Sequence, residues 1–203
     1  MEIISDDPYI FTIDNFISDE ECDLIINMSK PFMKRAEVSY VTEEEKEKVR
    51  AIEYKGRTNT SHWLHYNEHP KLLNICKRVS KILQCDYKLF EKFQVIHYNE
   101  GETYNYHYDA WDINNKERYK KYCSERGNRL ATVLCYLNDV KEGGGTGFDN
   151  LDGYEYIVKA KKGKIVFFTN TNKDGTINEN SRHSGLPVIK GEKWAFNLWL
   201  REK

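Results

Sequence analysis

The sequence predicts an α+β fold in which short strands build a closed or double-layered β-core and helices pack on one of its faces. Three observations lead to this prediction. Apolar stripes with helical spacing occur only in the first 88 residues, and alternation of period two dominates after them. Aromatic residues make up 13% of the chain, a share typical of β-structure, and 203 residues fit one domain.

The N-terminal segment is expected to contain a lead-in strand, Tyr9–Phe16, and two helices. Ser18 and Glu21 form a capping box before the first helix, because the hydroxyl can accept a free helix N–H while the carboxylate reaches back. The apolar stripe of this helix consists of Leu24, Ile25 and Met28. The second helix is predicted from about His69 to Leu83. Its buried face consists of Leu72, Leu73, Ile75, Val79 and Ile82.

Between these helices, the stretch Ser39–Asn59 contains the charge run Glu43–Lys48. Such runs are usually solvated, so a loop or a short exposed helix is expected there.

From Leu89 onward, six segments alternate with period two and are predicted to be strands. Glycine-containing turns such as Glu142–Gly145 and Lys190–Gly191 separate them. The six segments are Phe93–Tyr98, Thr103–Asp109, Arg129–Leu137, Tyr154–Val158, Lys164–Thr169 and Glu192–Arg201.

Charge and composition exclude several classes of protein. The chain has 31 basic and 32 acidic residues, so its net charge argues against binding of nucleic acid or an anionic membrane by the whole domain. Its apolar runs are far shorter than a bilayer span, and the N-terminus lacks the pattern of a secretion signal. Five cysteines without a C-x-x-C pair indicate reduced thiols. We therefore expect a cytoplasmic protein that binds neither nucleic acid nor membranes.

His107 and Asp109 are candidate metal ligands. They lie two apart in a predicted strand, so an imidazole and a carboxylate leave the same face. His183 follows 74 positions later. Two histidines and one carboxylate form the facial triad of non-heme Fe(II) oxygenases, which leaves coordination positions open. Alone, the His-x-Asp pair is a weak signal, since a surface histidine beside a turn aspartate has the same spacing.

Lys193 strengthens this interpretation. It lies ten residues after His183, and alternation places it on the opposite face of the last predicted strand from the apolar set. That apolar set, which is expected to face the core, consists of Trp194, Phe196, Leu198 and Leu200. A lysine on the pocket side would be costly unless an anion met it, and a dicarboxylic keto acid could chelate a metal while its far carboxylate reached the ammonium.

These residues belong to an ordered set of motifs that covers most of residues 93–201. The set consists of Phe93–Tyr98, Gly101, Tyr104, His107–Asp109, Arg129–Thr132, Tyr136–Asn138, Gly143–Gly144, Lys162–Gly163, His183–Val188, Gly191–Lys193 and Asn197–Trp199. With it, the sequence resembles the prolyl 4-hydroxylases of the Fe(II)/2-oxoglutarate dioxygenase family. Arg57–Thr60 matches the substrate-loop segment of that family.

The resemblance implies a double-stranded β-helix (jelly-roll) core with N-terminal helices packed on one face. It divides a single structural domain into an N-terminal support region, residues 1–88, and a dioxygenase core, residues 89–203. The support region includes a flexible substrate loop at about residues 39–60, expected to act as a lid.

The resemblance also implies a role for each candidate residue. Iron is bound by His107, Asp109 and His183, and the far carboxylate of 2-oxoglutarate by Lys193. The cosubstrate slot is lined by Tyr98 and Thr132. The walls of the proline pocket would be formed by Tyr104 and Trp199. The contacts to the peptide at the rim would be made by Arg57 and Arg201. The alternatives are ordinary aromatic packing for Tyr98 and Trp199 and solvated side chains for the two arginines.

The implied activity is that of a procollagen-proline 4-dioxygenase-like enzyme. It would hydroxylate a proline-containing peptide or protein at C4 and couple this to decarboxylation of 2-oxoglutarate to succinate. Fe(II), 2-oxoglutarate, O₂ and L-ascorbate are the implied cofactors and cosubstrates. Two alternatives remain: a related oxygenase that acts on a free amino acid or other small molecule, and a non-catalytic sensor of metal or 2-oxoglutarate. The intact triad with Lys193 favours an enzyme.

Two segments depart from the family pattern. Where the family commonly has Gly-Gly-Glu-Thr, this chain has Gly144–Gly147, and Ala110–Asn128 is a polar insertion that is expected to shape the pocket mouth. A zinc site at His62, His65 and His69 is disfavoured, because Pro70 and the surrounding polar residues indicate a loop edge.

Overall fold

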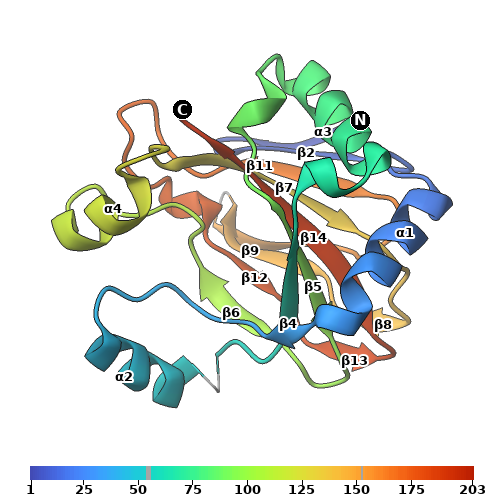
Figure 1. Cartoon of the computed structure of the whole chain (residues 1–203), viewed down its shortest axis with the longest axis horizontal. Coiled ribbons are helices and arrows are strands. Elements are labelled where there is room, and N and C mark those ends of the chain that lie inside the picture. Colours follow the sequence, from blue (N-terminus) through green and yellow to red (C-terminus); the bar gives the residue numbers. More distant parts are fainter. Residues whose placement is uncertain (54–55, 152) are drawn as a thin grey trace.

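The computed structural model describes residues 1–53, 56–151 and 153–203, and residues 49–53 by their backbone alone. An eight-stranded sheet faces a four-stranded one, and a two-stranded ribbon lies at one end (Figure 1). The large sheet has the order β1 (Glu2–Asp6), β2 (Tyr9–Ile13), β11 (Ile165–Thr169), β7 (Arg129–Tyr136), β14 (Lys193–Arg201), β5 (Phe93–Tyr98), β4 (Thr60–Leu64), β3 (Lys34–Arg35).

The small sheet has the order β10 (Tyr154–Val158), β9 (Thr146–Leu151), β12 (His183–Gly185), β6 (Tyr104–His107). The ribbon pairs β13 (Val188–Lys190) with β8 (Glu142–Gly143). The helices are α1 (Asp19–Ser29), α2 (Glu43–Glu53), α3 (Pro70–Leu83) and α4 (Lys116–Cys123). Adjacent strands are antiparallel throughout, as expected for a jelly roll.

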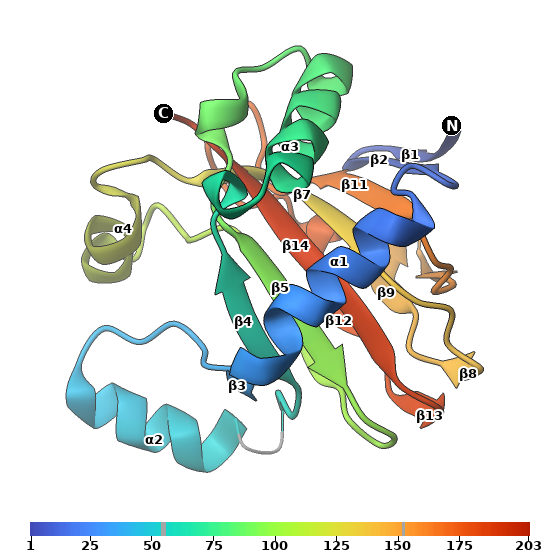
Figure 2. The ribbon, with the colours of Figure 1, turned by 45° about the vertical axis from the view of Figure 1, so that its right-hand side comes forward.

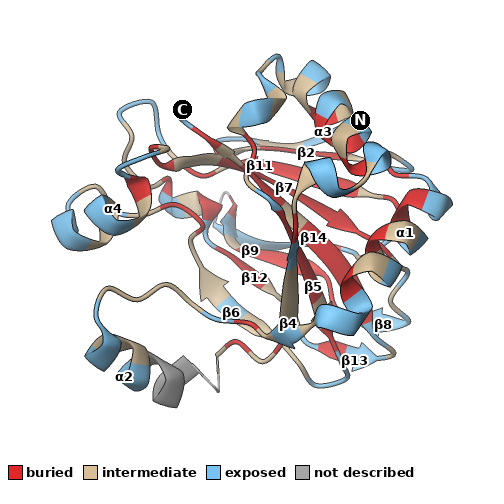
Figure 3. Ribbon diagram, in the orientation of Figure 1, coloured by how far each residue is buried: buried red, intermediate tan, exposed pale blue. Residues whose placement is uncertain are grey.

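Two apolar layers follow from the alternation of the central strand β14. One face of β14 packs with α1 and α3, which lie across the outer face of the large sheet (Figure 2). The β14 side chains in this layer are Trp194, Phe196, Leu198 and Leu200. The other face looks into the space between the sheets, where Ala195 packs with Phe148 of the small sheet. Buried residues are concentrated along the central strands (Figure 3), and the predicted helix-covered β-core is confirmed.

The predicted capping box of α1 is present. The Glu21 N–H donates to Ser18 Oγ at 3.3 Å, and the Ser18 N–H donates to Glu21 Oε2 at 3.0 Å. Arg78 of α3 donates to both oxygens of the same carboxylate at 2.8 Å. One acid therefore both caps α1 and ties it to α3.

Several elements differ from the sequence expectation. Strand β6 ends at His107, so Asp109 lies just beyond the strand rather than within it. The charge run adopts the helical alternative, as α2. The expected substrate loop at about 39–60 includes residues 54 and 55, which lie outside the described residues.

The polar insertion at residues 110–128 contains α4, which a sequence without a clear apolar stripe did not indicate. The three histidines of the disfavoured zinc site occupy different elements. His62 lies on β4, whereas His65 and His69 cap a 3₁₀ turn and α3 through their Nδ1 atoms. None of the helices in the described part of the chain is long and apolar enough to span a bilayer.

The stability of the helix-facing layer is tested by Phe196→Ala. Phe196 is fully buried and packs edge-to-face on Phe93, with ring centroids 4.9 Å apart. Its truncation is expected to lower the free energy of unfolding by about 3–5 kcal/mol, measured by urea denaturation. Ile189→Ala, at a position 61% exposed, is the control and is expected to change stability by less than about 0.5 kcal/mol. Equal losses in the two variants would contradict the layer assignment.

Candidate active site

Two histidines and one aspartate converge between the sheets. His107 ends β6 and His183 begins β12, and the two residues are direct partners in the antiparallel pair. Asp109 reaches both: Oδ1 lies 3.6 Å from His107 Nε2, and Oδ2 lies 3.6 Å from His183 Nε2. One ligand atom from each residue lies within 4.8 Å of the others. The predicted triad is therefore assembled in space.

Backbone carbonyls fix the orientation of both imidazoles. His107 Nδ1 lies 2.8 Å from the Asn105 carbonyl oxygen, and His183 Nδ1 lies 2.9 Å from that of Ser181. A carbonyl oxygen can only accept, so each Nδ1 carries the proton and each Nε2 keeps its lone pair for a metal. Burial, with the nearby His107, lowers the pKa of His183 to about 4. The buried imidazole is therefore neutral near pH 7.

The Asp109 carboxylate is held from behind. Its Oδ2 accepts hydrogen bonds from Thr132 Oγ1 at 2.6 Å and from Trp199 Nε1 at 2.8 Å. Asn170 in turn donates to Thr132 Oγ1 at 2.9 Å. Burial alone would raise the pKa of Asp109, but His183 and His107 hold this pKa well below its usual range. The carboxylate is therefore ionised and fixed.

The donor set fits Fe(II). It consists of two imidazole nitrogens and one carboxylate oxygen that lie within 4.8 Å of one another. This is the two-histidine, one-carboxylate arrangement of non-heme iron sites, and the supporting hydrogen bonds match those that orient metal ligands. His107 and Asp109 also line a groove.

Lys193 supplies a buried cation deeper in the same space. Its side chain is enclosed, with 1% exposure, and lies over the rings of Tyr98 at 5.1 Å and Tyr136 at 5.4 Å. The Nζ atom donates to the Gly145 carbonyl at 3.4 Å. No ion pair within the described part of the chain includes Lys193. Burial lowers the pKa of Lys193 to about 7.

A buried ammonium with one long hydrogen bond is incompletely satisfied, so the site suits an anion. Tyr98 pairs with Lys193 across β5 and β14, and its hydroxyl makes no hydrogen bond among the described residues. A Cβ added at Gly185 would lie 3.0 Å from this hydroxyl, so a side chain there would press on the slot. These features fit the far carboxylate of a metal-chelating keto acid.

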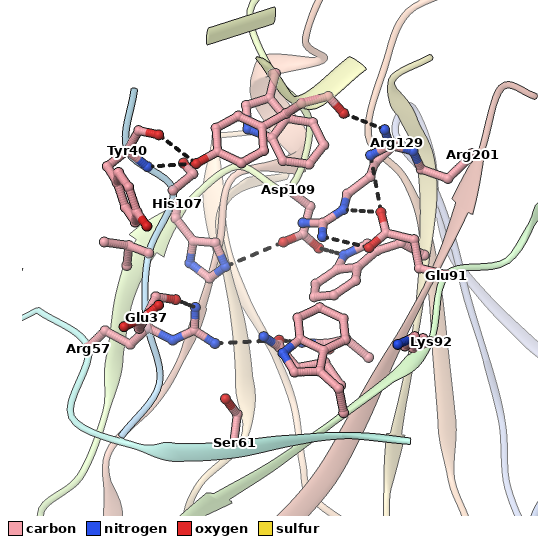
Figure 4. Close-up of a pocket in the computed structure, with 18 of the residues that line it drawn as sticks. Glu37, Tyr40, Arg57, Ser61, Glu91, Lys92, His107, Asp109, Arg129 and Arg201 are labelled. Carbon is pink, nitrogen blue, oxygen red and sulfur yellow. Dashed lines mark hydrogen bonds and ion pairs between the residues drawn. The ribbon is translucent and has the colours of Figure 1, made fainter. Parts of the chain in front are cut away.

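The groove outside the triad has a volume of about 1350 Å³ (Figure 4). Tyr104 lines it and stacks on His107, with ring centroids 3.6 Å apart. Trp199 lies 5.8 Å from Trp63 of β4, also between ring centroids. Together, these flat side chains form an aromatic channel beside the metal ligands.

The two predicted rim arginines are buried rather than solvated. Arg57 donates to Asn59 Oδ1 and to the Glu37 carbonyl oxygen, and it lies 4.3 Å above the Tyr104 ring. Arg201 donates to Glu91 at 3.1 Å. Both line the groove.

Sequence reasoning missed a second set of groove residues. Arg129 binds both oxygens of Glu91 and lies 3.5 Å above the Trp199 ring. Trp111 of the insertion lies beneath the guanidinium groups of Arg129 and Arg201. The sequence did contain a signal: Glu91 comes just before one predicted strand, and Arg129 begins another. Whether they form an ion pair depends on the order of the strands in the sheet, which the sequence does not give.

Comparison with known proteins gives a consistent result. The family model of the 2OG-Fe(II) oxygenase superfamily matches residues 93–201. The chain is 33% identical over 217 residues to Probable prolyl 4-hydroxylase 10 of Arabidopsis thaliana, covering 99% of this chain and 71% of the relative. It is 32% identical to human prolyl 4-hydroxylase subunit alpha-1, covering 98% of this chain but 35% of the relative.

A solved structure is similar over nearly the whole chain. The viral collagen prolyl hydroxylase vCPH from Paramecium Bursaria Chlorella virus-1, in complex with 2OG, superposes with a TM-score of 0.72 at 28% identity. The match covers 98% of each chain.

The support of Asp109 is tested by Trp199→Phe. This change keeps an aromatic ring but removes the N–H that donates to Asp109 Oδ2. Affinity for Fe(II), measured anaerobically by calorimetry, is expected to fall about 10–100-fold. Trp63→Phe changes an indole of the same channel and is expected to leave the metal affinity unchanged. Unaltered affinity in Trp199→Phe would mean that the hydrogen bond does not support the ligand.

The state of Lys193 predicts a pH dependence. In the free protein its pKa is about 7, below the ordinary 10.5, so the ammonium is present below pH 7 and is lost above it. Above that pH, an anion that pairs with the ammonium can bind only if Lys193 takes up a proton. The Kd for 2-oxoglutarate is therefore expected to rise by up to about tenfold per pH unit above pH 7.

Calorimetry in buffers of different ionisation enthalpy measures this proton uptake directly. Lys193→Met should abolish the uptake. A Kd that stays flat with pH in the unaltered protein would contradict the depressed pKa.

Proposed function

Since the chain belongs to the 2OG-Fe(II) oxygenase superfamily, and within it to the prolyl 4-hydroxylases, we propose that it hydroxylates proline residues of a peptide or protein at C4. One observation carries this proposal. The triad of His107, Asp109 and His183 and the buried Lys193 occupy one space, and an aromatic channel leads to it.

Each polar residue has a distinct task. The triad holds Fe(II), and Lys193 pairs with the far carboxylate of 2-oxoglutarate while the Tyr98 hydroxyl lies free to contact the cosubstrate. When bound, the iron and 2-oxoglutarate supply O₂ activation and C–H hydroxylation, with release of succinate and CO₂. The protein contributes fixed ligand orientation and a dry enclosure, because His183, Asp109 and Lys193 are all buried.

The channel suits an extended peptide. A proline ring is a small apolar disc. Tyr104 stacks on His107 and Trp199 donates to Asp109, so both aromatic side chains line the groove beside the metal ligands. A peptide in the polyproline II conformation has little conformational entropy left to lose and exposes its rings to aromatic surfaces. The resemblance to a collagen prolyl hydroxylase and to prolyl 4-hydroxylases of plants and animals supports this substrate class.

The proposal extends to a cofactor and to a cellular compartment. L-Ascorbate is expected to sustain turnover, as in the family. A reducing compartment such as the cytoplasm is supported by the cysteines, all of which are free. Those buried in apolar surroundings, such as Cys76, have thiol pKa values raised by burial and are chemically inert.

We also propose that the segment before α2 closes over the peptide. The stem of this segment, Ser39 and Tyr40, is hydrogen-bonded to α4 in the polar insertion. The Tyr122 hydroxyl donates to the Tyr40 carbonyl at 2.6 Å and accepts from the Tyr40 N–H at 2.9 Å. Arg118 donates to the Ser39 carbonyl and forms an ion pair with Glu45. The insertion thereby positions one wall of the groove.

Peptide turnover tests the proposed activity. Short proline-rich peptides are expected to stimulate succinate formation and to gain one oxygen on proline, detected by mass spectrometry, whereas free L-proline does so poorly. Asp109→Ala, which removes a metal ligand, should abolish both signals. If free proline or another amino acid outperformed every peptide, the peptidyl substrate would be wrong while the oxygenase assignment survived.

The stem contact is tested by Tyr122→Phe, which keeps the stacking on Trp111 but loses both hydrogen bonds to Tyr40. Each bond contributes about 1 kcal/mol, so amide hydrogen exchange at residues 39–45 should accelerate roughly 5–30-fold. Tyr119→Phe, on the same helix, removes a hydroxyl that makes no hydrogen bond among the described residues and is the control.

A bound proline-rich peptide should slow the exchange at residues 39–45 in the unaltered protein. Equal protection with and without peptide would count against closure of this segment over the substrate.

A further inference from the structure

The groove is basic although the chain is nearly neutral. Described residues lining it include eight lysines or arginines but four aspartates or glutamates, against 31 and 32 in the whole chain. The cations are Lys34, Arg35, Arg57, Lys92, Lys121, Arg126, Arg129 and Arg201. The acids are Glu37, Glu91, Asp109 and Glu125. The positive excess is therefore a local property of the groove.

Part of this charge is already neutralised. Glu91 pairs with Arg129 and Arg201, and Asp109 belongs to the metal triad. The remaining acids, Glu37 and Glu125, are exposed at the rim.

Several groove cations form no ion pair among the described residues, and four of them lie towards the outside of the groove. Lys121 donates to the Val41 carbonyl, and Arg126 donates to the carbonyls of Lys88 and Phe90. Lys34 and Lys92 are exposed and make no side-chain hydrogen bond in the described part of the chain. In Figure 4, the Lys92 side chain stands at the groove with no drawn interaction. Lys34 and Lys92 are therefore available to a ligand, whereas Lys121 and Arg126 are held by carbonyls and contribute charge.

The strand register places Lys34 and Lys92 along one wall. Lys34 pairs with Ser61, and Ser61 pairs with Ile96 of β5. Lys92 lies four residues before Ile96, so the two lysines share a face and are separated by roughly 13 Å along the strands. Trp63 lies between these two levels.

The support of Asp109 lies at the Lys92 end of this wall. Trp199, which donates to Asp109, pairs with Thr132, and its carbonyl accepts from the Glu91 N–H, so it is level with Lys92. An extended peptide advances about 3.1 Å per residue in the polyproline II conformation, so the roughly 13 Å between the two lysines corresponds to about four residues. A side chain next to the target proline would therefore reach Lys92, and one about four residues away would reach Lys34.

We propose that the substrate peptide carries two acidic side chains about four residues apart, one beside the target proline, where Lys92 binds it, and one farther along, where Lys34 binds it. Lys121 and Arg126, on the insertion side of the same groove, add to the attraction. This inference rests on the proposed function and specifies its substrate. Because Lys34, Lys92 and Lys121 are exposed, their effect on binding is moderate and is screened by salt.

Three labelled peptides that differ only at these two positions, with Glu, Gln or Lys, test the inference by fluorescence anisotropy. At low salt, the Glu peptide is expected to bind about tenfold more tightly than the Lys peptide, with the Gln peptide between them. The difference should shrink towards unity at high salt. Equal affinities at low salt would overturn the proposal.

The double variant Lys34→Glu/Lys92→Glu should reverse the preference. Its matched control, Lys81→Glu/Lys190→Glu, changes two exposed lysines outside the groove by the same charge and should keep the preference. A preference unchanged by the groove variant, or equally changed by the control, would contradict the assigned positions.

Hydroxylation of the neutral Gln peptide tests the proposed function separately from the acidic preference. If it gains oxygen but binds like the charged peptides, the activity stands and the acidic preference is wrong. If no peptide gains oxygen while the preference and its reversal are observed, the acidic-peptide site stands and the hydroxylase assignment fails.

Discussion

The buried ammonium of Lys193 is the constraint on which the site depends. It lies between the two sheets, where no carboxylate among the described residues pairs with it, at one end of the central strand β14. Burying a cation in this way is unfavourable unless an anion completes the site. The same strand carries Trp199, which holds Asp109. One strand therefore carries both the residue that we propose pairs with the cosubstrate and a residue that supports a proposed metal ligand.

Much of this arrangement was predictable from the sequence because it follows strand alternation. Period two placed Lys193 opposite the helix-facing apolar set, and the spacing of His107 and Asp109 brought them to one side even though Asp109 lies beyond its strand. The His183 strand has three residues, too few to show alternation. Its pairing with His107 comes from the tertiary fold alone.

The hydrogen bonds around the ligands were less predictable. The acceptors at Asn105 and Ser181 are backbone carbonyls, which any residue could supply. Thr132 and Trp199 were assigned by resemblance to the cosubstrate slot and the proline pocket, and in the fold both also donate to Asp109. The helical insertion lacked an apolar stripe because it packs through polar contacts on the segment before α2. The positive charge of the groove could not be predicted either, because the residues that supply it are far apart in the sequence and meet only in the fold.

The role of Lys193 is tested most directly by comparing 2-oxoglutarate with 2-oxopentanoate, which has the same chain length but a methyl group in place of the far carboxylate. Anaerobic calorimetry on the iron-loaded protein gives Kd for both ligands, in the unaltered protein and in Lys193→Met. A buried charge pair contributes about 2–5 kcal/mol, so 2-oxoglutarate should bind roughly 30- to several thousand-fold more tightly, and the advantage should largely disappear in Lys193→Met. Equal affinities in the unaltered protein, or an advantage that survives in the variant, would contradict the assignment.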